Sequence, residues 1–367
     1  MFSVRNVAIV LGVVMLAGPF VAWKAYQRYD HEVHVYIESR PPLRDLRDLV
    51  RLWPWPSEYL RCREATPSPL PRFEAPAFII GGKLYTFGGF TTPGLTAITR
   101  CDRYDPQADV WEPLADLPEP VTHAAAALDG TDVWLAGGFV GDHPGEATAS
   151  VWKYDAVRDE WVAGVPLPKP RAAGGLALLS GKLHFFGGSE DDRSTDSGDH
   201  WVMDIAADEP AWEPAAPMPF RRHHFGTAVL DGKIHAIGGQ RHHDFAGFGM
   251  RAQIDTDRVD VYEPQTDAWS DGVPLPRPRA HFEPGTFVWK ERICIAGGEG
   301  GFTQALYNIH CYDPTEKSWI EMPGLPEPLR APIVKPLDDR WFVGTGGVMP
   351  SGGRPGAQVW MCREPSG

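Results

Sequence analysis

The dipeptide Gly-Gly recurs at a nearly constant interval, and this recurrence constrains the fold more than any other feature of the sequence. Each of six doublets follows a short apolar run, and the intervals between successive first glycines are 49, 50, 51, 59 and 49 residues. The doublets are Gly88-Gly89, Gly137-Gly138, Gly187-Gly188, Gly238-Gly239, Gly297-Gly298 and Gly346-Gly347. A period of about 50 residues is typical of repeat proteins in which each unit forms one small sheet.

Two further patterns keep a fixed phase to the doublets. Four units carry a Tyr-Asp or Tyr-Glu pair six residues before a tryptophan: Tyr104-Asp105 with Trp111, Tyr154-Asp155 with Trp161, Tyr262-Glu263 with Trp269, and Tyr312-Asp313 with Trp319. Five units carry a Leu-Pro or Met-Pro dipeptide, which we call the proline pair, and its first residue stands six positions after a tryptophan. These dipeptides are Leu117-Pro118, Leu167-Pro168, Met218-Pro219, Leu275-Pro276 and Leu325-Pro326. Asp231-Gly232 between two apolar runs indicates a two-residue hairpin. Each unit thus reads as four short antiparallel strands, too small a sheet to bury its own faces, so the six units must pack radially.

Together these patterns resemble kelch repeats. The resemblance implies an all-β, six-bladed β-propeller with four-stranded antiparallel blades over residues 59–363 and a tail at 364–367. Two units depart from the pattern. The third has Met203-Asp204 eight residues before Trp212, and the sixth has Trp360-Met361-Cys362 where Tyr-Asp would stand, with no later tryptophan. The sixth blade therefore lacks an outer strand, and we expect residues 59–66 to supply it.

This closure brings Cys62 near Cys362. A disulfide there would lock the ring, and two buried thiols are the alternative. Cys294 and Cys311 fall on neighbouring strands of the fifth blade and could also meet. The odd count of five cysteines leaves at least one unpaired, and no Cys-x-x-Cys spacing indicates a zinc site.

The amino end contains residues 7–23, which carry no charge and are flanked by Arg5 and Lys24. We interpret residues 1–23 as an uncleaved signal anchor, a transmembrane helix at the short limit for crossing a bilayer, rather than a cleaved signal peptide. Residues 24–58 would form a stem, with the propeller exported to the periplasmic or extracellular side. The net charge of −13 argues against a nucleic-acid partner.

Basic residues recur at the start of the units. The third residue after the proline pair is arginine in three units, Arg171, Arg222 and Arg279, and the fifth is histidine in three units, His123, His224 and His281. Residues two apart on a strand share a side, so we expect a partial ring of cations at the mouth of the central channel. The alternative is that these side chains only bracket neighbouring loops.

The fourth unit adds Arg241 and His243 in the loop of about residues 240–258, which accounts for the longest interval. So many cations in an acidic protein indicate an anionic ligand, bound bidentately by arginine. Glu74, Glu283 and Glu299 offer carboxylates, and the third-unit loop adds Glu190, Asp191, Asp192 and Arg193. We predict no cofactor and no metal, although the histidines of the fourth unit could bind copper or zinc.

Two classes of function fit these features. The first is a membrane-tethered module that binds a protein, a peptide or a glycan at its loop face. The second, suggested by a distant resemblance to the kelch-type sialic acid mutarotase, is an exported enzyme on an acidic sugar, with a carboxylate as general acid or base and arginine holding the substrate carboxylate. The sequence favours the binding module and names no catalytic residue.

Overall fold

The computed structural model describes residues 58–91, 95–244, 251–300, 304–339, 341–347 and 356–364, without the side chains of residues 243, 244, 251–253 and 341. The predicted signal anchor at 1–23 and nearly all of the stem at 24–58 lie outside these residues. Within the described part, no helix has the length and apolar character needed to cross a membrane.

Six four-stranded antiparallel sheets make up the described part of the chain. The first three blades are β2 (Ala77–Ile80), β3 (Lys83–Phe87), β6 (Cys101–Asp105) and β7 (Val110–Pro113); β9 (Ala125–Asp129), β10 (Asp132–Ala136), β13 (Val151–Asp155) and β14 (Glu160–Ala163); and β15 (Gly175–Leu179), β16 (Lys182–Phe186), β17 (His200–Asp204) and β18 (Glu213–Pro214). The last three are β19 (Gly226–Leu230), β20 (Lys233–Ile237), β23 (Val259–Glu263) and β24 (Ala268–Asp271); β25 (Thr286–Trp289), β26 (Arg292–Ala296), β27 (Ile309–Asp313) and β28 (Ser318–Met322); and β29 (Ile333–Pro336), β30 (Trp341–Thr345), β31 (Val359–Arg363) and β1 (Arg61–Ala65).

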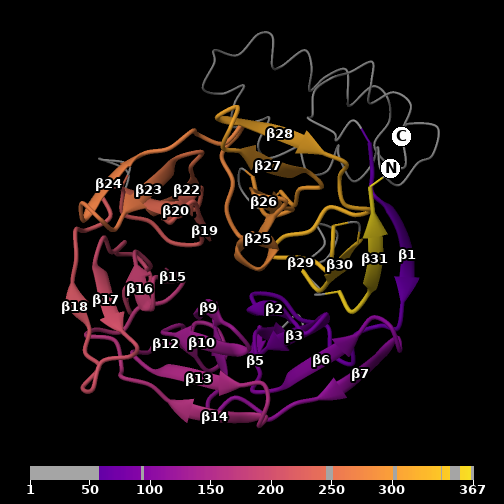
Figure 1. Ribbon diagram of the computed structural model, residues 1–367, viewed down its shortest axis with the longest axis horizontal. Helices are drawn as coiled ribbons and strands as arrows, with labels where there is room; N and C mark the ends of the chain where they lie inside the picture. Colours follow the sequence, from indigo (N-terminus) through magenta and orange to yellow (C-terminus); the bar gives the residue numbers. More distant parts are fainter. Residues whose placement is uncertain are drawn as a thin grey trace.

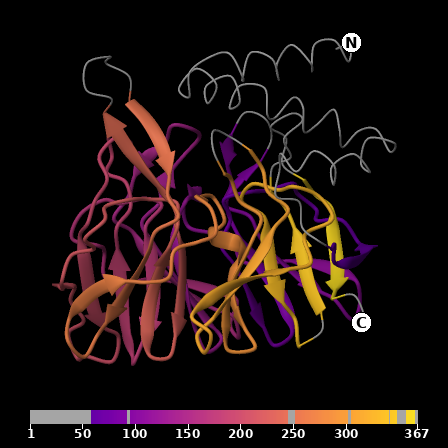
Figure 2. The same cartoon turned by 90° about the horizontal axis from the view of Figure 1, so that it is seen from above.

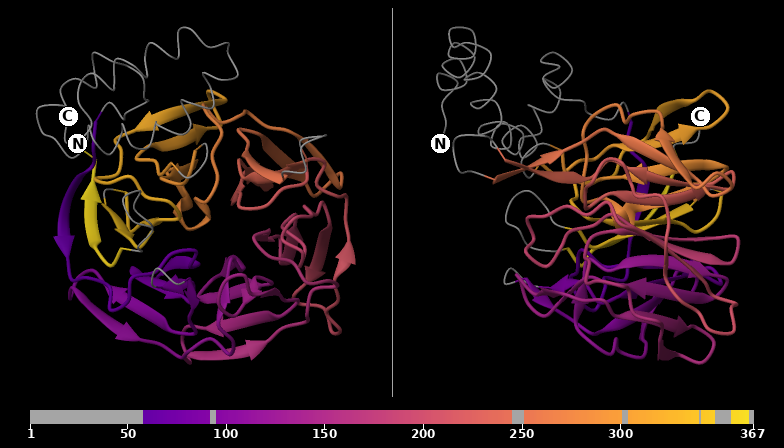
Figure 3. Two further views of the ribbon diagram at one scale, coloured as in Figure 1. Left: turned by 180° about the vertical axis from the view of Figure 1, so that it is seen from behind. Right: turned by 90° about the vertical axis from the view of Figure 1, so that its left-hand side faces the viewer.

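The blades stand in a ring, each with its first strand innermost; in the sixth, β1 is outermost (Figure 1). Figure 3 shows the same ring from behind and from the side. Short accessory strands occupy the loops: β4 (Phe90–Thr91) with β5 (Thr96–Ala97), β8 (Val121–Thr122) with β11 (Phe139–Val140) and β12 (Glu146–Ala147), and β21 (Gln240–Asp244) with β22 (Arg251–Asp255). The β21–β22 hairpin rises above one face of the disc, which we call the loop face (Figure 2).

The amino-terminal strand closes the ring, as the missing outer strand of the sixth repeat predicted. β1 pairs antiparallel with β31, and Cys62 lies directly opposite Cys362. These two cysteines form a disulfide that joins residues 300 positions apart in sequence. Cys294 and Cys311, opposite each other on β26 and β27, form a second disulfide. Cys101 is buried as a free thiol.

The Gly-Gly doublets lock each blade to the next. Both glycines of every doublet have positive φ, and the second donates its N–H to a carbonyl at the head of the following blade. Gly138 N, for example, lies 2.8 Å from the Arg171 oxygen. A Cβ on Gly137 would fall 2.2 Å from that same oxygen, so a side chain cannot be accommodated there.

The outer tryptophans make the corresponding link at the rim. Each indole N–H donates to a carbonyl oxygen of the preceding blade or, for Trp111, of the closing strand's end: Trp111 to Thr66, Trp161 to Ala115, Trp212 to Val165, Trp269 to Ala216 and Trp319 to Val273. Trp212 keeps this bond despite the altered spacing of the third repeat. The repeat signature therefore consists of residues that join blades, which is why it specifies the fold and leaves the ligand open.

Candidate functional site

The three predicted arginines, Arg171, Arg222 and Arg279, are buried and do not offer a free cationic surface at the channel mouth. Arg222 is 0% exposed, and its guanidinium donates to Asp260 Oδ2 at 2.5 Å and to the carbonyl oxygens of Gly238 at 2.7 Å and Ala236 at 2.9 Å. Burial lowers the pKa of Arg222, which the Asp260 carboxylate partly offsets. All of its donor nitrogens are engaged inside the fourth blade, so the expectation that Arg222 faces a ligand is corrected.

Arg171 and Arg279 are also buried, although fewer of their donors are engaged, and Arg171 Nε has no hydrogen bond. Arg171 bonds to Asp199 at 2.6 Å and lies 3.3 Å from Glu190, while Arg279 donates to the Asn308 oxygen at 3.1 Å. Arg72 is a fourth member, buried against Asp102. The sequence pattern missed Arg72 because Leu70-Pro71 stands two residues out of phase with the other proline pairs. We call Arg72, Arg171, Arg222 and Arg279 the bracket arginines.

The histidines behave differently, because their backbone is left-handed. The equivalent position in every blade has a φ between 49° and 55°, and these positions are Glu74, His123, Ala173, His224, His281 and Ala331. Backbone hydrogen bonds join successive members of this ring: Ala173 N donates to His123 O, His224 N to Ala173 O, His281 N to His224 O, and Ala331 N to His281 O. The sequence located the three histidines but not their partner Glu74 at the same position.

Five side chains from this region form what we call the channel cluster: Glu74, His123, His224, His281 and Glu283. The ring centroids of His123 and His224 lie 4.9 Å apart, and those of His224 and His281 lie 4.0 Å apart. His281 Nδ1 donates to Glu74 Oε1 at 2.8 Å, and His224 Nδ1 lies 3.0 Å from Glu283 Oε1. Glu283 reaches the cluster from the 3₁₀ turn Glu283–Gly285, which precedes β25.

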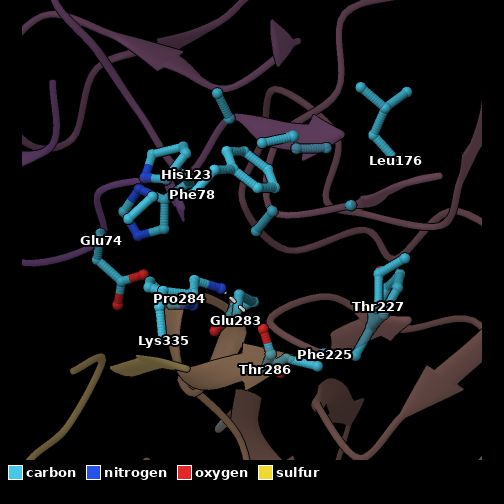
Figure 4. Close-up of a pocket in the computed structure, with 17 residues that line it drawn as sticks. Glu74, Phe78, His123, Leu176, Phe225, Thr227, Glu283, Pro284, Thr286 and Lys335 are labelled. Carbon is cyan, nitrogen blue, oxygen red and sulfur yellow. Dashed lines mark hydrogen bonds between the residues drawn. The ribbon is translucent and has the colours of Figure 1, made fainter. Parts of the chain in front are cut away.

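A cavity of about 100 Å³ lies beside this cluster, inside the ring of innermost strands. Glu74, His123, Glu283 and Lys335 are its titratable lining residues, and Leu176 and Thr227 stand on the other side of the cavity (Figure 4). One buried water needs roughly 10–15 Å³, so the space admits several waters or a polar group of a ligand. It is too small for a folded partner, which could insert only a side chain or a sugar.

The two carboxyls of the channel cluster, Glu74 and Glu283, have pKa values shifted in opposite directions. Burial alone would raise the pKa of Glu74, but the charges of His281 and His123 and the His281 hydrogen bond lower it to about 2. Burial and the Glu74 charge raise the pKa of Glu283 to about 8. Near neutral pH, one carboxyl is therefore ionised and the other carries its proton.

The pKa values of the channel histidines are also shifted in opposite directions. Although burial opposes its charge, the Glu74 carboxylate raises the pKa of His281 to about 9. Burial lowers the pKa of His123 to about 4 and holds that of His224 well below its ordinary value. Burial also lowers the pKa of Lys335 to about 7. Glu74 and His281 thus form an ion pair, and His224 is a neutral imidazole facing a protonated Glu283.

Arg193 is a cation at the mouth that lacks a hydrogen-bonded partner for much of its guanidinium. Its Nε and Nη2 atoms are enclosed and have no hydrogen bond. The guanidinium carbon stacks 3.4 Å from the centre of the Phe139 ring, and Phe139 in turn contacts His123 with ring centroids 5.7 Å apart. The charge of Arg193 contributes to the lowered pKa values of both His123 and His224. Arg193 therefore holds two unpaired donors beside the channel cluster, and a ligand reaches them only after the guanidinium moves from Phe139.

The fourth-blade loop meets the predicted site only in part. Arg241 packs against Phe220, with 5.1 Å between its guanidinium carbon and the ring centre. His243 lies on β21, and its side chain is outside the described residues. Neither residue is placed in the channel cluster, so their binding role stays a prediction.

Two groups of three side chains in the described part have ligand atoms within 4.8 Å of one another and the chemistry to hold a metal ion. The first, Glu74 with His123 and His224, belongs to the channel cluster, where the protonated His281 already occupies the carboxylate. The second is Asp196 with His223 and His242, on the loop face next to the cluster.

Comparison with known proteins identifies the class. The family model described as "Kelch motif" matches residues 71–118, 120–168 and 221–276. These matches, the six four-stranded blades and the glycine doublets support a kelch-repeat β-propeller. The sequence-based assignment of the repeats is confirmed.

Among similar proteins, Kelch repeat-containing protein At3g27220 of Arabidopsis thaliana is 25% identical over 257 residues, which cover 66% of this chain and 59% of that protein. Kelch-like protein 35 of Mus musculus is 26% identical over 250 residues, covering 68% of this chain and 39% of that protein. The chain thus matches between about two fifths and three fifths of these relatives. The solved structure of YjhT superposes with a TM-score of 0.62 at 17% identity over 80% of this chain and 95% of that chain, a likeness of fold.

Proposed function

We propose that this propeller is a binding module that takes an anionic group of its ligand, such as a carboxylate, at the mouth of the central channel. The observation that carries the proposal is Arg193, whose enclosed Nε and Nη2 atoms have no partner. Buried donors are rarely left unpaired, and a guanidinium edge matches a carboxylate bidentately. The Glu74–His281 pair compensates its own charge, whereas Arg193 makes no ion pair among the described residues and is only partly offset by the nearby Asp191 charge.

The ligand class is a protein, a peptide or a glycan that inserts one such group. Relatives named Kelch-like proteins favour a protein partner, and the limited size of the cavity favours an acidic side chain or an acidic sugar at the point of contact. The predicted anchor at residues 1–23 would tether the module to a membrane with the propeller exported. Fractionation of the full chain with and without residues 1–23 tests that part separately.

Calorimetric titration of the purified full chain with glucuronic acid and N-acetylneuraminic acid tests the site. We expect saturable binding that weakens by roughly ten- to hundredfold in Arg193→Gln, as a charge-assisted hydrogen bond is worth about 1.5–3 kcal/mol. Arg158→Gln is the matched control, because Arg158 is an exposed arginine on the rim. Equal loss in both variants, or no binding to either sugar and to acidic peptides, would reject the proposal.

A second candidate function is proton-transfer catalysis on an acidic sugar. The specific observation is the pair of carboxyls with opposed pKa shifts, since such a split assigns an acid and a base within one site. Ring opening of a sugar needs a proton delivered to the ring oxygen and a proton removed from the anomeric hydroxyl. Protonated Glu283 can deliver the first, and the ionised Glu74 carboxylate can accept the second.

Exchange between the anomers of N-acetylneuraminic acid, followed by NMR, tests this candidate. The full chain should accelerate the exchange, and Glu283→Gln should abolish the acceleration while the sugar still binds. If the anomers exchange at the rate of buffer alone although binding is saturable, the protein is a binding module and not this enzyme.

A further inference from the structure

We propose that Asp196, His223 and His242 form a divalent-metal site of the zinc type on the loop face. The three side chains come from separate segments. Asp196 lies in the loop after β16, His223 at the head of the fourth blade, and His242 on β21. This site is separate from the channel cluster and does not depend on the proposed function.

The ligand atoms already lie at distances close to those of a coordination shell. Asp196 Oδ1 is 2.8 Å from His223 Nδ1 and 2.9 Å from His242 Nδ1. The two imidazole rings stack with centroids 4.8 Å apart and planes 19° from parallel. Around a tetrahedral zinc with bonds of about 2.0–2.2 Å, neighbouring ligand atoms are about 3.4 Å apart. An ion can therefore replace the two hydrogen bonds after a small movement of the side chains.

The other carboxylate oxygen is held by the protein. Asp196 Oδ2 accepts the backbone N–H of His242 at 2.7 Å, which fixes the carboxylate and leaves Oδ1 for the ion. Such support of a ligand by a second contact is typical of metal sites. Two imidazoles and one carboxylate suit zinc and similar transition metals better than calcium or magnesium, and three protein ligands leave a coordination position for water or a ligand.

Gln240 supplies an independent observation. It is 3% exposed, and its Oε1 has no hydrogen-bond partner. Its Nε2 donates to Asp255 Oδ1 at 2.9 Å, and because a carboxylate only accepts, this bond fixes which end of the amide is the oxygen. Reciprocal backbone bonds pair Gln240 with His223. Directly paired residues share a face, as do residues two apart on a strand. The orphan oxygen thus belongs to the same face as His223 and His242, where a cation would satisfy it.

The neighbouring group Glu74–His123–His224 is the natural competitor for the ion. Its carboxylate is bonded to protonated His281, whose charge repels a second cation. No such bond to a cationic lysine or arginine is made by Asp196 among the described residues. His123→Asn is therefore the matched control, since it removes one nitrogen ligand from the competing group, and asparagine tolerates the left-handed backbone at position 123.

The experiment uses the full chain, stripped of metal with a chelator and titrated with Zn²⁺ by calorimetry and with Co²⁺ by visible absorption. We expect one equivalent of each ion, with an affinity at least a hundredfold lower in Asp196→Asn and in His242→Phe, and within threefold of the wild type in His123→Asn. His242→Phe keeps the ring stack on His223 and removes only the ligand nitrogen. Saturating Zn²⁺ should also raise the thermal midpoint of the wild type and not of these two variants.

Three results would overturn the proposal. If the wild type takes up no stoichiometric zinc, the three residues only form hydrogen bonds between two loops. If zinc is lost in His123→Asn and retained in Asp196→Asn, the ion belongs to the channel cluster. If Asp196→Asn fails to fold, an unchanged zinc affinity in His242→Phe would also assign the ion to the channel cluster.

Discussion

The bracket arginines and the channel histidines stand two residues apart on the same segments, yet they do opposite things. Arg222 and Arg279 point into the protein and end on their own partners, whereas His224 and His281 meet at the centre of the ring. Side chains two apart share a side only on an extended strand. The histidines have φ values of 52° and 51°, and this left-handed residue turns the second side chain toward the channel. One backbone dihedral thus separates a structural residue from a functional candidate.

The largest effect should follow loss of a bracket arginine. Arg222→Ala leaves Oδ2 of the buried Asp260 carboxylate without its partner, while Arg258 still pairs with Oδ1. Breaking such a buried pair costs roughly 3–5 kcal/mol, and the remaining Arg258 places the loss at the lower end of that range. Denaturant unfolding measures this loss, with Arg158→Ala as control, whose exposed ion pair should contribute under about 1 kcal/mol. If Arg222→Ala unfolds like Arg158→Ala but weakens ligand binding, the two sets of residues have exchanged roles and the comparison fails.

The Gly-Gly doublets contact the backbone of the segments that carry the bracket arginines, so substitution of a doublet glycine should also destabilise the protein. In Gly137→Ala the new methyl group meets the Arg171 carbonyl oxygen, so we expect a loss of roughly 2–4 kcal/mol from strain and displacement of the blades. Gly130 has a similar φ of 63° but open space around a Cβ, so Gly130→Ala reports the backbone term alone, about 1 kcal/mol. Similar stabilities of the two variants would show that the doublet is not an interblade contact.

The channel histidines should instead appear in the pH dependence of stability. The pKa of His281 is raised from 6.5 to about 9 in the folded protein. Its contribution is therefore complete below pH 6.5 and is lost as the pH rises toward 9, by about 3 kcal/mol. Unfolding free energies measured between pH 6 and 9.5 should fall less steeply in His281→Asn than in the wild type. Parallel curves would mean that His281 is not charged in the fold.

The sequence predicts most of the fold because the kelch signature consists of the residues that join the blades. The doublets, the tryptophans and the missing outer strand of the sixth blade were enough to place β1 against β31. The site was predicted less well, since contacts between loops far apart in sequence determine it. Arg193 was one charge among four in an acidic loop, and Glu283 enters the channel through a 3₁₀ turn that the repeat pattern does not contain. Asp196 meets His223 and His242 only because two blades adjoin.

Histidine side-chain NMR of the full chain, with and without N-acetylneuraminic acid, tests most directly whether the centre of the ring is the binding site. In the free protein, His281 should titrate near pH 9, while His123 and His224 stay neutral at pH 7. The sugar should shift the signals of the three channel histidines and leave those of His184 and His200, buried within the third blade, unchanged. Binding without any shift of the channel histidines, or shifts confined to the third-blade pair, would contradict a ligand site at the channel cluster.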